Sequence, residues 1–298
     1  MTESGVGIAV IGGSGLYEME GLQDVQRVSV RTPFGSPSDE VVLARLGEAR
    51  IAFLPRHGRG HRILPGEINA RANIYALKSL GVQRIIAVNA VGSLREEVAP
   101  LHVVVPDQLL DRTRGRPSTF FGGGIAAHVG FAEPYCPQLS DIVARAAAAC
   151  GATVHVRGTY VCIEGPQFST KAESRVYRQW GADIIGMTAL PEARLAREAE
   201  ICYTTLALVT DYDVWNGAAE TVSVDMVVSN LLKNTALARR TILKAVPEVP
   251  AARDCACAKA LRDAIMTHVD HLPAKIREDL APIIGRYLSR EPIDVGRT

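Results

Sequence analysis

Two carboxylates one residue apart, Asp211 and Asp213, follow a long apolar run that ends at Val209. An apolar run of this kind predicts a strand buried on both faces, and ligand sites in open α/β sheets lie where such strands end. Side chains at i and i+2 of an extended segment point to the same side, so both carboxylates can face one target. Because mutual repulsion and lost solvation raise carboxyl pKa values, one of the pair could hold a proton near neutral pH and act as a general acid. The alternative is a pair of solvated turn aspartates that cap the next helix.

A glycine-rich turn, from Gly12 to Gly15 with Ser14 inside it, follows the first predicted strand. Such a turn can present backbone N–H groups and a hydroxyl to an anion. A dinucleotide fingerprint would need glycine where the chain has Glu18, and no Gly-Lys-Ser/Thr follows as in a Walker loop. A tight turn without a ligand remains the alternative.

Three more strand ends carry donors suited to an anion. Arg56 and His57 follow the predicted strand 51–54, and a guanidinium matches phosphate oxygens. His57 and His61 could suggest a metal, but no third ligand accompanies them, and a solvated basic loop is the other alternative. The segments 89–93 and 187–188 also lie where apolar runs stop, and they offer small side chains, an amide and hydroxyls. Together the four strand ends predict a site for one small anion.

The elements that position these residues alternate between strand and helix. The predicted strands cover 8–11, 41–43, 51–54, 85–88, 103–105, 160–162, 184–185 and 201–209, and the predicted helices cover 70–80, 139–150, 171–180, 191–200 and 223–246. This order predicts an α/β fold with a mixed or largely parallel central sheet. The last helix carries one apolar stripe, with Ser223 as its N-cap: Val224, Val227, Val228, Leu231 and Leu232. Residues 114–124 are expected to form a mobile loop, and 251–298 a helical extension packed on a single domain of residues 1–250.

Composition favours a globular enzyme. The chain has 298 residues, of which 47% are hydrophobic and 22% charged. A net charge of +1, from 33 basic and 32 acidic residues, provides no overall field that would attract nucleic acid or an anionic membrane. With neither a signal-peptide pattern nor a span of roughly 20 apolar residues, a cytoplasmic protein is expected. The six cysteines lack the C-x-x-C spacing of structural zinc sites, so free thiols and no metal are expected.

Taken together, eight motifs between about residues 7 and 246 resemble the methylthioadenosine phosphorylases, in the trimeric-type branch of the purine nucleoside phosphorylase family. The motifs are 11–16, 32–38, 56–58, 90–97, 107–113, 164–169, 186–188 and 210–213. The resemblance implies a single α/β catalytic domain with a mixed central sheet flanked by helices. It also implies a homotrimer or a dimer of trimers that uses inorganic phosphate as a co-substrate and needs no cofactor or metal.

The resemblance further implies a role for each candidate residue. Those of the phosphate site would be Ser14, Arg56, His57, Asn89, Ala90 and Thr188. Those of the nucleoside site would be Gly92, His128 from a neighbouring subunit, Phe168 stacked on the purine, Ile185, Met187 against the ribose, Tyr212, and Val224 and Val228 around the methylthio group. Ser169 and Val224 would bear on specificity, although core packing is the alternative for the two valines. Asn89 and Val91 depart from the family pattern, in which threonine or serine and, in some members, cysteine occur.

The implied activity is that of a pentosyltransferase in purine and methionine salvage, which converts methylthioadenosine and phosphate to adenine and 5-methylthioribose 1-phosphate. Asp211, protonated, would give a proton to purine N7, and Asp213 would support that proton. Relatives acting on 6-oxopurine nucleosides carry asparagine in place of Asp211, so they are the nearest alternative, and a non-catalytic nucleoside sensor is another. Similar proteins from heat-adapted organisms contain a C-x-C disulfide, which suggests oxidation of Cys255 with Cys257 and a second conceivable pair, Cys136 with Cys202.

Overall fold

The computed structural model describes the main chain of residues 6–17, 19–216 and 224–288, with the side chains of all of these except residues 14, 17 and 224–228. The strands are β1 (Ile8–Gly12), β2 (Gln23–Val28), β3 (Val41–Leu46), β4 (Ala49–Pro55), β5 (Arg84–Ser93), β6 (Val103–Val105), β7 (Gln108–Arg112), β8 (Val154–Val156), β9 (Thr159–Ile163), β10 (Ile184–Gly186) and β11 (Cys202–Tyr212). The α-helices are α1 (Ala70–Ser79), α2 (Pro137–Ala149), α3 (Lys171–Gln179), α4 (Glu192–Glu198), α5 (Val224–Glu248), α6 (Ala274–Asp279) and α7 (Ala281–Ile284).

One mixed sheet contains all of these strands, in the order β2-β3-β4-β1-β5-β10-β9-β7, with β11 also paired to β5 and leading on to β6 and β8. At its centre, β4, β1, β5 and β11 run parallel, so their carboxyl ends meet on one side. β5 is long enough to pair with β1 near its start and with β10 near its end. Residues that follow or end these strands are therefore brought together.

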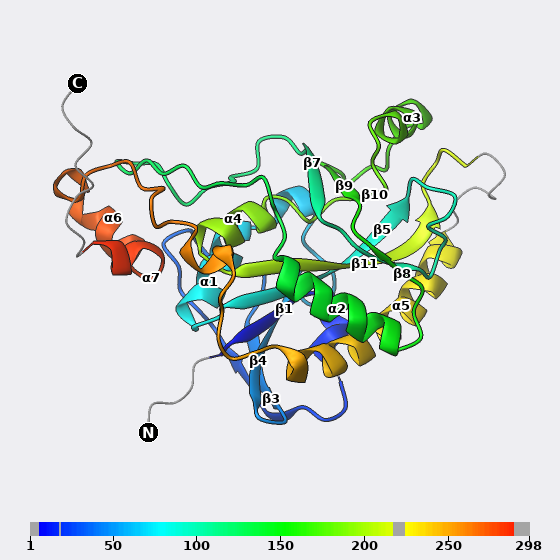
Figure 1. The fold of residues 1–298 in the computed structure, drawn as a ribbon, viewed down its shortest axis with the longest axis horizontal. Coiled ribbons are helices and arrows are strands. Elements are labelled where there is room, and N and C mark those ends of the chain that lie inside the picture. Colours follow the sequence, from blue (N-terminus) through cyan, green and yellow to red (C-terminus); the bar gives the residue numbers. More distant parts are fainter. Residues whose placement is uncertain (1–5, 18, 217–223, 289–298) are drawn as a thin grey trace.

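Helices cover both faces of the sheet (Figure 1). α2 and α5 pack against each other and against β11, and their apolar residues share one core with the side chains on that face. α1 and α4 contribute to a second core on the opposite face. The α/β architecture with a mixed central sheet flanked by helices confirms the fold expected from the sequence.

Local signals explain where several helices begin. The Asn69 side chain accepts a hydrogen bond from the Ala72 N–H and so caps α1. Thr170 and Glu173 form a reciprocal capping box at the start of α3. α2 begins at Pro137, whose missing N–H costs nothing in the first turn.

The segment after α5, where the sequence predicted a helical extension, contains short helical elements in its described part. It contains three short 3₁₀ turns (Ala256–Lys259, Val269–His271 and Gly285–Tyr287) together with α6 and α7. Leu261, Leu272, Leu280 and the residues 283–284 are buried in the same core as α1 and α4. Hydrophobic burial therefore joins this segment to the sheet domain.

The structure contains an element for every strand and helix that the sequence predicted, and it adds β2, β7 and β8. β2 has the sequence Gln-Asp-Val-Gln-Arg-Val and is almost wholly exposed, so it lacks the apolar pattern that identified the other strands. Residues 89–93, expected just past a strand, are the last residues of β5 itself. The expected loop 114–124 is an irregular segment, and Arg116 fastens it by donating hydrogen bonds to Glu164 and to the Met187 and Leu190 carbonyls.

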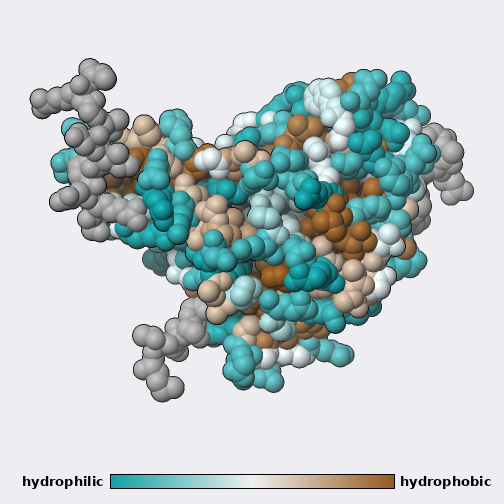
Figure 2. All heavy atoms as spheres, viewed as in Figure 1, coloured by the Kyte–Doolittle hydropathy of each residue, from teal (hydrophilic) through white to brown (hydrophobic). Residues whose placement is uncertain are grey.

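Most of the visible surface is hydrophilic, and hydrophobic residues reach it in small separate areas (Figure 2). Among the described residues, none of the helices combines the length and the apolarity that crossing a membrane would need.

Candidate active site

A cavity of about 490 Å³ opens at the carboxyl ends of β1, β4, β5 and β11. Its size matches a nucleoside-sized ligand, since small-molecule sites occupy roughly 300–1,000 Å³. The residues around it include Gly13, Gly15, Arg56, His57, Asn89, Ala90, Val91, Gly92, Phe168, Ser169, Ile185, Met187, Thr188, Thr210, Asp211, Asp213, Leu231 and Thr235. The four strand ends that the sequence predicted to form an anion site, those of β1, β4, β5 and β10, thus converge in the fold, and the end of β11 with its two carboxylates joins them.

A β-bulge turns both carboxylates into the cavity. The pairing of β11 with β5 runs in regular register to Val209 opposite Val91 and then resumes with Asp211 opposite Gly92, so Thr210 is an extra residue. A bulge changes which face the following side chains reach. Leu208 and Thr210 already border the cavity, and without the bulge simple alternation would point Asp211 away from it.

The setting raises the pKa of both carboxyl groups. Burial raises the pKa of Asp211 above its ordinary value, the nearby charge of Asp213 raises it further, and a hydrogen bond from Thr210 acts in the opposite direction. Burial likewise raises the pKa of Asp213, against the hydrogen bond that the Ser174 hydroxyl donates to Asp213 Oδ2 at 2.5 Å. Ser174 is completely buried in α3 and was not identified from the sequence, in which it resembles any polar residue of an exposed helix.

The Thr210 hydroxyl fixes how Asp211 is oriented. Thr210 Oγ1 lies 2.7 Å from Asp211 Oδ2 and 3.2 Å from the Val91 carbonyl oxygen. Asp211 Oδ1 faces Gly92, where an added Cβ would come within 3.1 Å of that oxygen. When the Thr210 hydroxyl donates its one proton to Oδ2, Oδ1 is the oxygen that remains to carry a proton of Asp211.

Amide and hydroxyl groups also line the cavity. The buried Asn89 side chain donates from Nδ2 to Thr188 Oγ1 at 2.7 Å, which leaves the threonine hydroxyl proton available to a ligand. The Arg56 backbone N–H donates to the Gly12 carbonyl and so ties the ends of β4 and β1 together. Two buried side-chain oxygens around the cavity, Asn89 Oδ1 and Ser169 Oγ, have no hydrogen-bond partner among the described residues. Buried polar atoms of this kind are typical of ligand sites.

Arg56 borders the cavity, but most of its guanidinium is engaged inside the protein. Its Nε and Nη2 each lie 2.9 Å from a Glu192 carboxylate oxygen, and both side chains are almost fully buried. Nη1 donates to the Val88 carbonyl at 3.1 Å, and Tyr203 donates to Glu192. The Glu192 carboxylate holds the pKa of Arg56 above its ordinary value, against the effect of burial. Glu192, 136 residues away along the chain, gave no signal in the sequence.

His57 is a neutral group in this setting. Burial, with the neighbouring Arg56 and His61, lowers the pKa of His57 from 6.5 to about 4. Nδ1 lies 2.8 Å from the Ile63 carbonyl oxygen, so the neutral ring carries its proton there and offers Nε2 as an acceptor. His57 can therefore accept a hydrogen bond from a protonated oxygen of an anion.

Apolar groups form another part of the cavity lining. Phe168 is 72% exposed and stands at the rim, where its ring can cover a ligand. Leu231 and Thr235 come from α5. They lie seven residues beyond Val224 and Val228, two helical turns along the same face. Of the predicted stripe, Leu231 borders the cavity, whereas Leu232 is 70% exposed and does not. The side chains of Val224, Val227 and Val228 lie outside the described residues, as does that of Ser14.

Two of the predicted site residues do not border this cavity. Tyr212 points the other way from Asp211 and Asp213, and its hydroxyl donates to the Glu96 carbonyl. His128 is exposed in the 120–132 segment, and its N–H donates to the Ala264 carbonyl. The remaining predicted residues with described side chains all surround the cavity.

Comparison with known proteins connects the cavity to one family. A family model described as "Phosphorylase superfamily" matches residues 7–247. The S-methyl-5'-thioadenosine phosphorylase of Geobacter sulfurreducens is 57% identical, over 94% of this chain and 99% of its own, and that of Koribacter versatilis is 56% identical, over 95% and 97%.

Solved structures give the same relationship. A methylthioadenosine phosphorylase from an antarctic soil metagenomic library superposes with a TM-score of 0.91 at 49% identity, over 94% of this chain and 99% of the other. The methylthioadenosine phosphorylase of Schistosoma mansoni in complex with adenine has a TM-score of 0.81 at 38% identity, over 86% and 96%.

Proposed function

The chain belongs to the phosphorylase superfamily, and we propose that it catalyses the reversible phosphorolysis of methylthioadenosine to adenine and 5-methylthioribose 1-phosphate. It is a phosphate-dependent pentosyltransferase. The observation that carries the proposal is one cavity lined both by two carboxyl groups of raised pKa and by a group of anion donors. The high identity to methylthioadenosine phosphorylases over nearly the whole chain supports the same substrate.

In the proposed reaction the bond between C1′ and N9 breaks, and a phosphate oxygen forms the new bond to C1′. The bond-breaking electron pair stays on the purine, so a proton delivered to N7 stabilises the leaving group. Asp211 Oδ1 supplies that proton, and its carboxylate is reprotonated from solvent after adenine leaves. Asp213 keeps the proton on its neighbour by its charge, and Ser174 holds Asp213 in place.

The phosphate lies on the opposite side of the ribose in this proposal. The Thr188 hydroxyl and the backbone N–H groups of the 12–15 turn donate to its oxygens, with Ser14 as a further donor. His57 Nε2 accepts from a protonated phosphate oxygen, and Asn89 and Ala90 complete the site. Arg56 acts mainly through its positive charge and its remaining Nη1 N–H, because Glu192 engages the rest of the guanidinium. The phosphate dianion also offsets the positive charge that develops on the sugar, so neither a metal nor another cofactor takes part.

The nucleoside fills the apolar part of the cavity. Met187 lies against the ribose, Phe168 stacks on the base, and Ser169 offers its unpartnered Oγ to the purine. Leu231 and the α5 face that continues to Val224 and Val228 enclose the methylthio group. His128 closes this end from a neighbouring subunit, in a homotrimer or a dimer of trimers. The setting is cytoplasmic purine and methionine salvage.

The experiment that tests this function compares the release of free base from methylthioadenosine, adenosine and inosine, each with and without phosphate. Methylthioadenosine should react fastest, only with phosphate, and should yield 5-methylthioribose 1-phosphate. Faster turnover of inosine would favour a 6-oxopurine nucleoside phosphorylase instead. Tight binding of methylthioadenosine without turnover in phosphate would favour the sensor alternative.

A further inference from the structure

Four of the six cysteines meet at one point far from the active-site cavity. The Sγ atoms of Cys136, Cys202, Cys255 and Cys257 all lie within 4.8 Å of one another. Cys136, Cys202 and Cys257 are buried, and Cys255 is partly buried.

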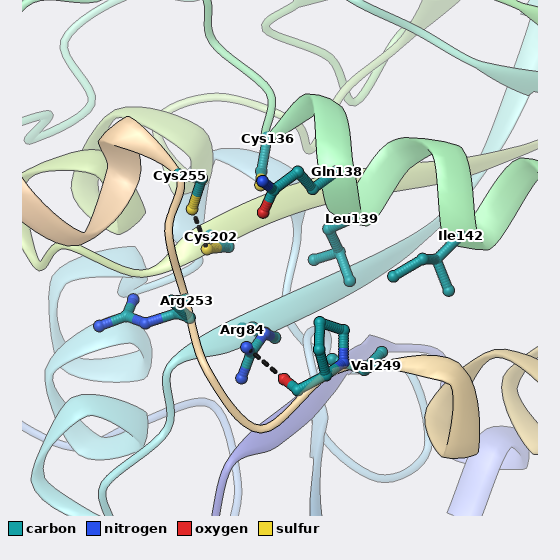
Figure 3. A pocket seen from close by; sticks show the side chains of 10 residues that line it. Arg84, Cys136, Gln138, Leu139, Ile142, Cys202, Val249, Arg253 and Cys255 are labelled. Carbon is teal, nitrogen blue, oxygen red and sulfur yellow. Dashed lines mark hydrogen bonds between the residues drawn. The ribbon is translucent and has the colours of Figure 1, made fainter.

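Separate elements bring these thiols together. Cys136 is the residue before α2, and Cys202 is the first residue of β11. Cys255 and Cys257 belong to the short turn at Ala256–Lys259, after the chain has crossed back from α5. Figure 3 shows Cys202 and Cys255 facing each other, with Cys136 beside them. The Sγ atoms of Cys202 and Cys255 are 3.3 Å apart.

We propose that Cys136, Cys202, Cys255 and Cys257 form a structural zinc site, with one zinc ion held by four thiolates. A tetrahedral zinc ion with bonds of about 2.3 Å to sulfur places its sulfur atoms about 3.8 Å apart. The Sγ atoms of Cys202 and Cys255 are 3.3 Å apart, and no two of the four Sγ atoms are more than 4.8 Å apart, so these distances bracket that value. Only small side-chain movements are needed to bring four ligands onto one ion.

The donor set favours a soft metal such as zinc. The cluster contains thiols alone, with no carboxylate or imidazole, which suits zinc and excludes magnesium or calcium as the occupant. Four cysteines also fill all four positions of a tetrahedral ion. A closed site of this kind is structural, since a catalytic zinc keeps one position open to water or substrate.

Positive charge lies beside the four thiols. Arg84 and Arg253 line the same small hollow (Figure 3), held by backbone carbonyls, and neither forms an ion pair with a carboxylate in the described part of the chain. Two nearby guanidinium groups can offset the double negative charge of a zinc ion with four thiolates.

The site would fasten three segments that are far apart in sequence. It would link the start of α2 and the start of β11 to the segment after α5, which reaches into the main core through Leu261. The C-x-C spacing of Cys255 and Cys257, with two isolated partners, explains why the sequence suggested free thiols and no metal. Tertiary structure alone brings these four ligands together.

The test uses the full-length protein, expressed with zinc in the medium and purified with a reductant. Elemental analysis should find about one zinc ion per chain, and cobalt substitution should give the intense visible bands of tetrahedral cobalt thiolate. The variant Cys257→Ser should retain less than about a tenth of the zinc after dialysis against a chelator. Cys150→Ser, which changes a cysteine at the end of α2 outside the cluster, should keep it all.

If Cys257→Ser does not fold, measurements on the unmodified chain test the zinc site instead. Native mass spectrometry of that chain, mixed with zinc under reductant, should show a one-zinc species. A metal-free chain with its thiols still reduced would overturn the proposal. Intact masses showing that the four cysteines form disulfides in protein purified with a reductant would also overturn it. Equal zinc contents in Cys257→Ser and Cys150→Ser would do the same.

Discussion

Replacing Asp211 with asparagine removes one acidic proton from the cavity and keeps the size of the side chain. The Thr210 hydroxyl donates to one oxygen of Asp211 at 2.7 Å, and the same bond in the variant orients the new amide. The asparagine oxygen accepts from Thr210, so its NH₂ group takes the place of Oδ1 beside Gly92 and faces the ligand. The variant can donate a hydrogen bond but cannot transfer a proton to purine N7.

The expected loss follows from that proton. Phosphorolysis of methylthioadenosine should fall by about 10²–10⁴-fold, the usual contribution of general acid catalysis, which corresponds to about 3–5 kcal/mol in the barrier. An NH₂ donor matches the carbonyl oxygen of a 6-oxopurine, so turnover of inosine should fall much less, or rise. The ratio of inosine to methylthioadenosine turnover should therefore increase by roughly tenfold or more.

The assay measures initial rates of adenine and hypoxanthine release at saturating phosphate over a range of pH. Asp270→Asn makes the same chemical change at an exposed position and serves as the control. In the parent, activity should decline on the alkaline side as Asp211 loses its proton, because burial keeps the protonated form to a pH above its ordinary pKa. Thr210→Val removes a bond that favours the carboxylate, so this decline should move to higher pH by about one unit.

One result would refute the assignment of Asp211 as the general acid. If Asp211→Asn leaves both rates, and their ratio, within about threefold of the parent, far below a general-acid contribution, the carboxyl group is only part of the strand end. An unchanged pH profile in Thr210→Val would separately show that the hydroxyl does not control the proton.

Three further predictions concern the anion side of the cavity. Arg56→Ala should lower the free energy of unfolding by about 3–5 kcal/mol in urea denaturation, because it leaves the Glu192 carboxylate buried without its partner, and unchanged stability would contradict the buried pair. Thr188→Val should raise the phosphate KM by about tenfold while Thr188→Ser does not, since only the serine keeps a hydroxyl to donate; equal effects in steady-state kinetics would remove that hydroxyl from the phosphate site. The pKa of His57 falls from 6.5 to about 4 in the folded chain, so its contribution to stability is complete above pH 6.5 and is lost as the pH drops toward 4. Melting temperatures of the parent should decline more steeply over that interval than those of His57→Gln, and parallel curves would exclude this linkage.

Local patterns in the sequence were sufficient for the fold and for most of the cavity. Apolar runs such as 85–88 and 201–209 predict buried strands, because a strand covered on both faces needs apolar side chains throughout. Glycine, amide and hydroxyl residues at the ends of these runs then indicate one site, since parallel strands bring their carboxyl ends together. β2 was missed for the same reason, as its polar residues carry no burial pattern.

The sequence by itself also determined that Asp211 and Asp213 lie at a strand end, but the direction of their side chains depends on an extra residue. Thr210 is accommodated as a bulge only because β11 pairs with β5, more than a hundred residues earlier in the chain. The engagement of Arg56 by Glu192 and the meeting of Cys202 with Cys255 likewise join distant segments. Such contacts are decided by packing between elements, which sets distances and burial that no local pattern contains, and only the tertiary structure could decide them.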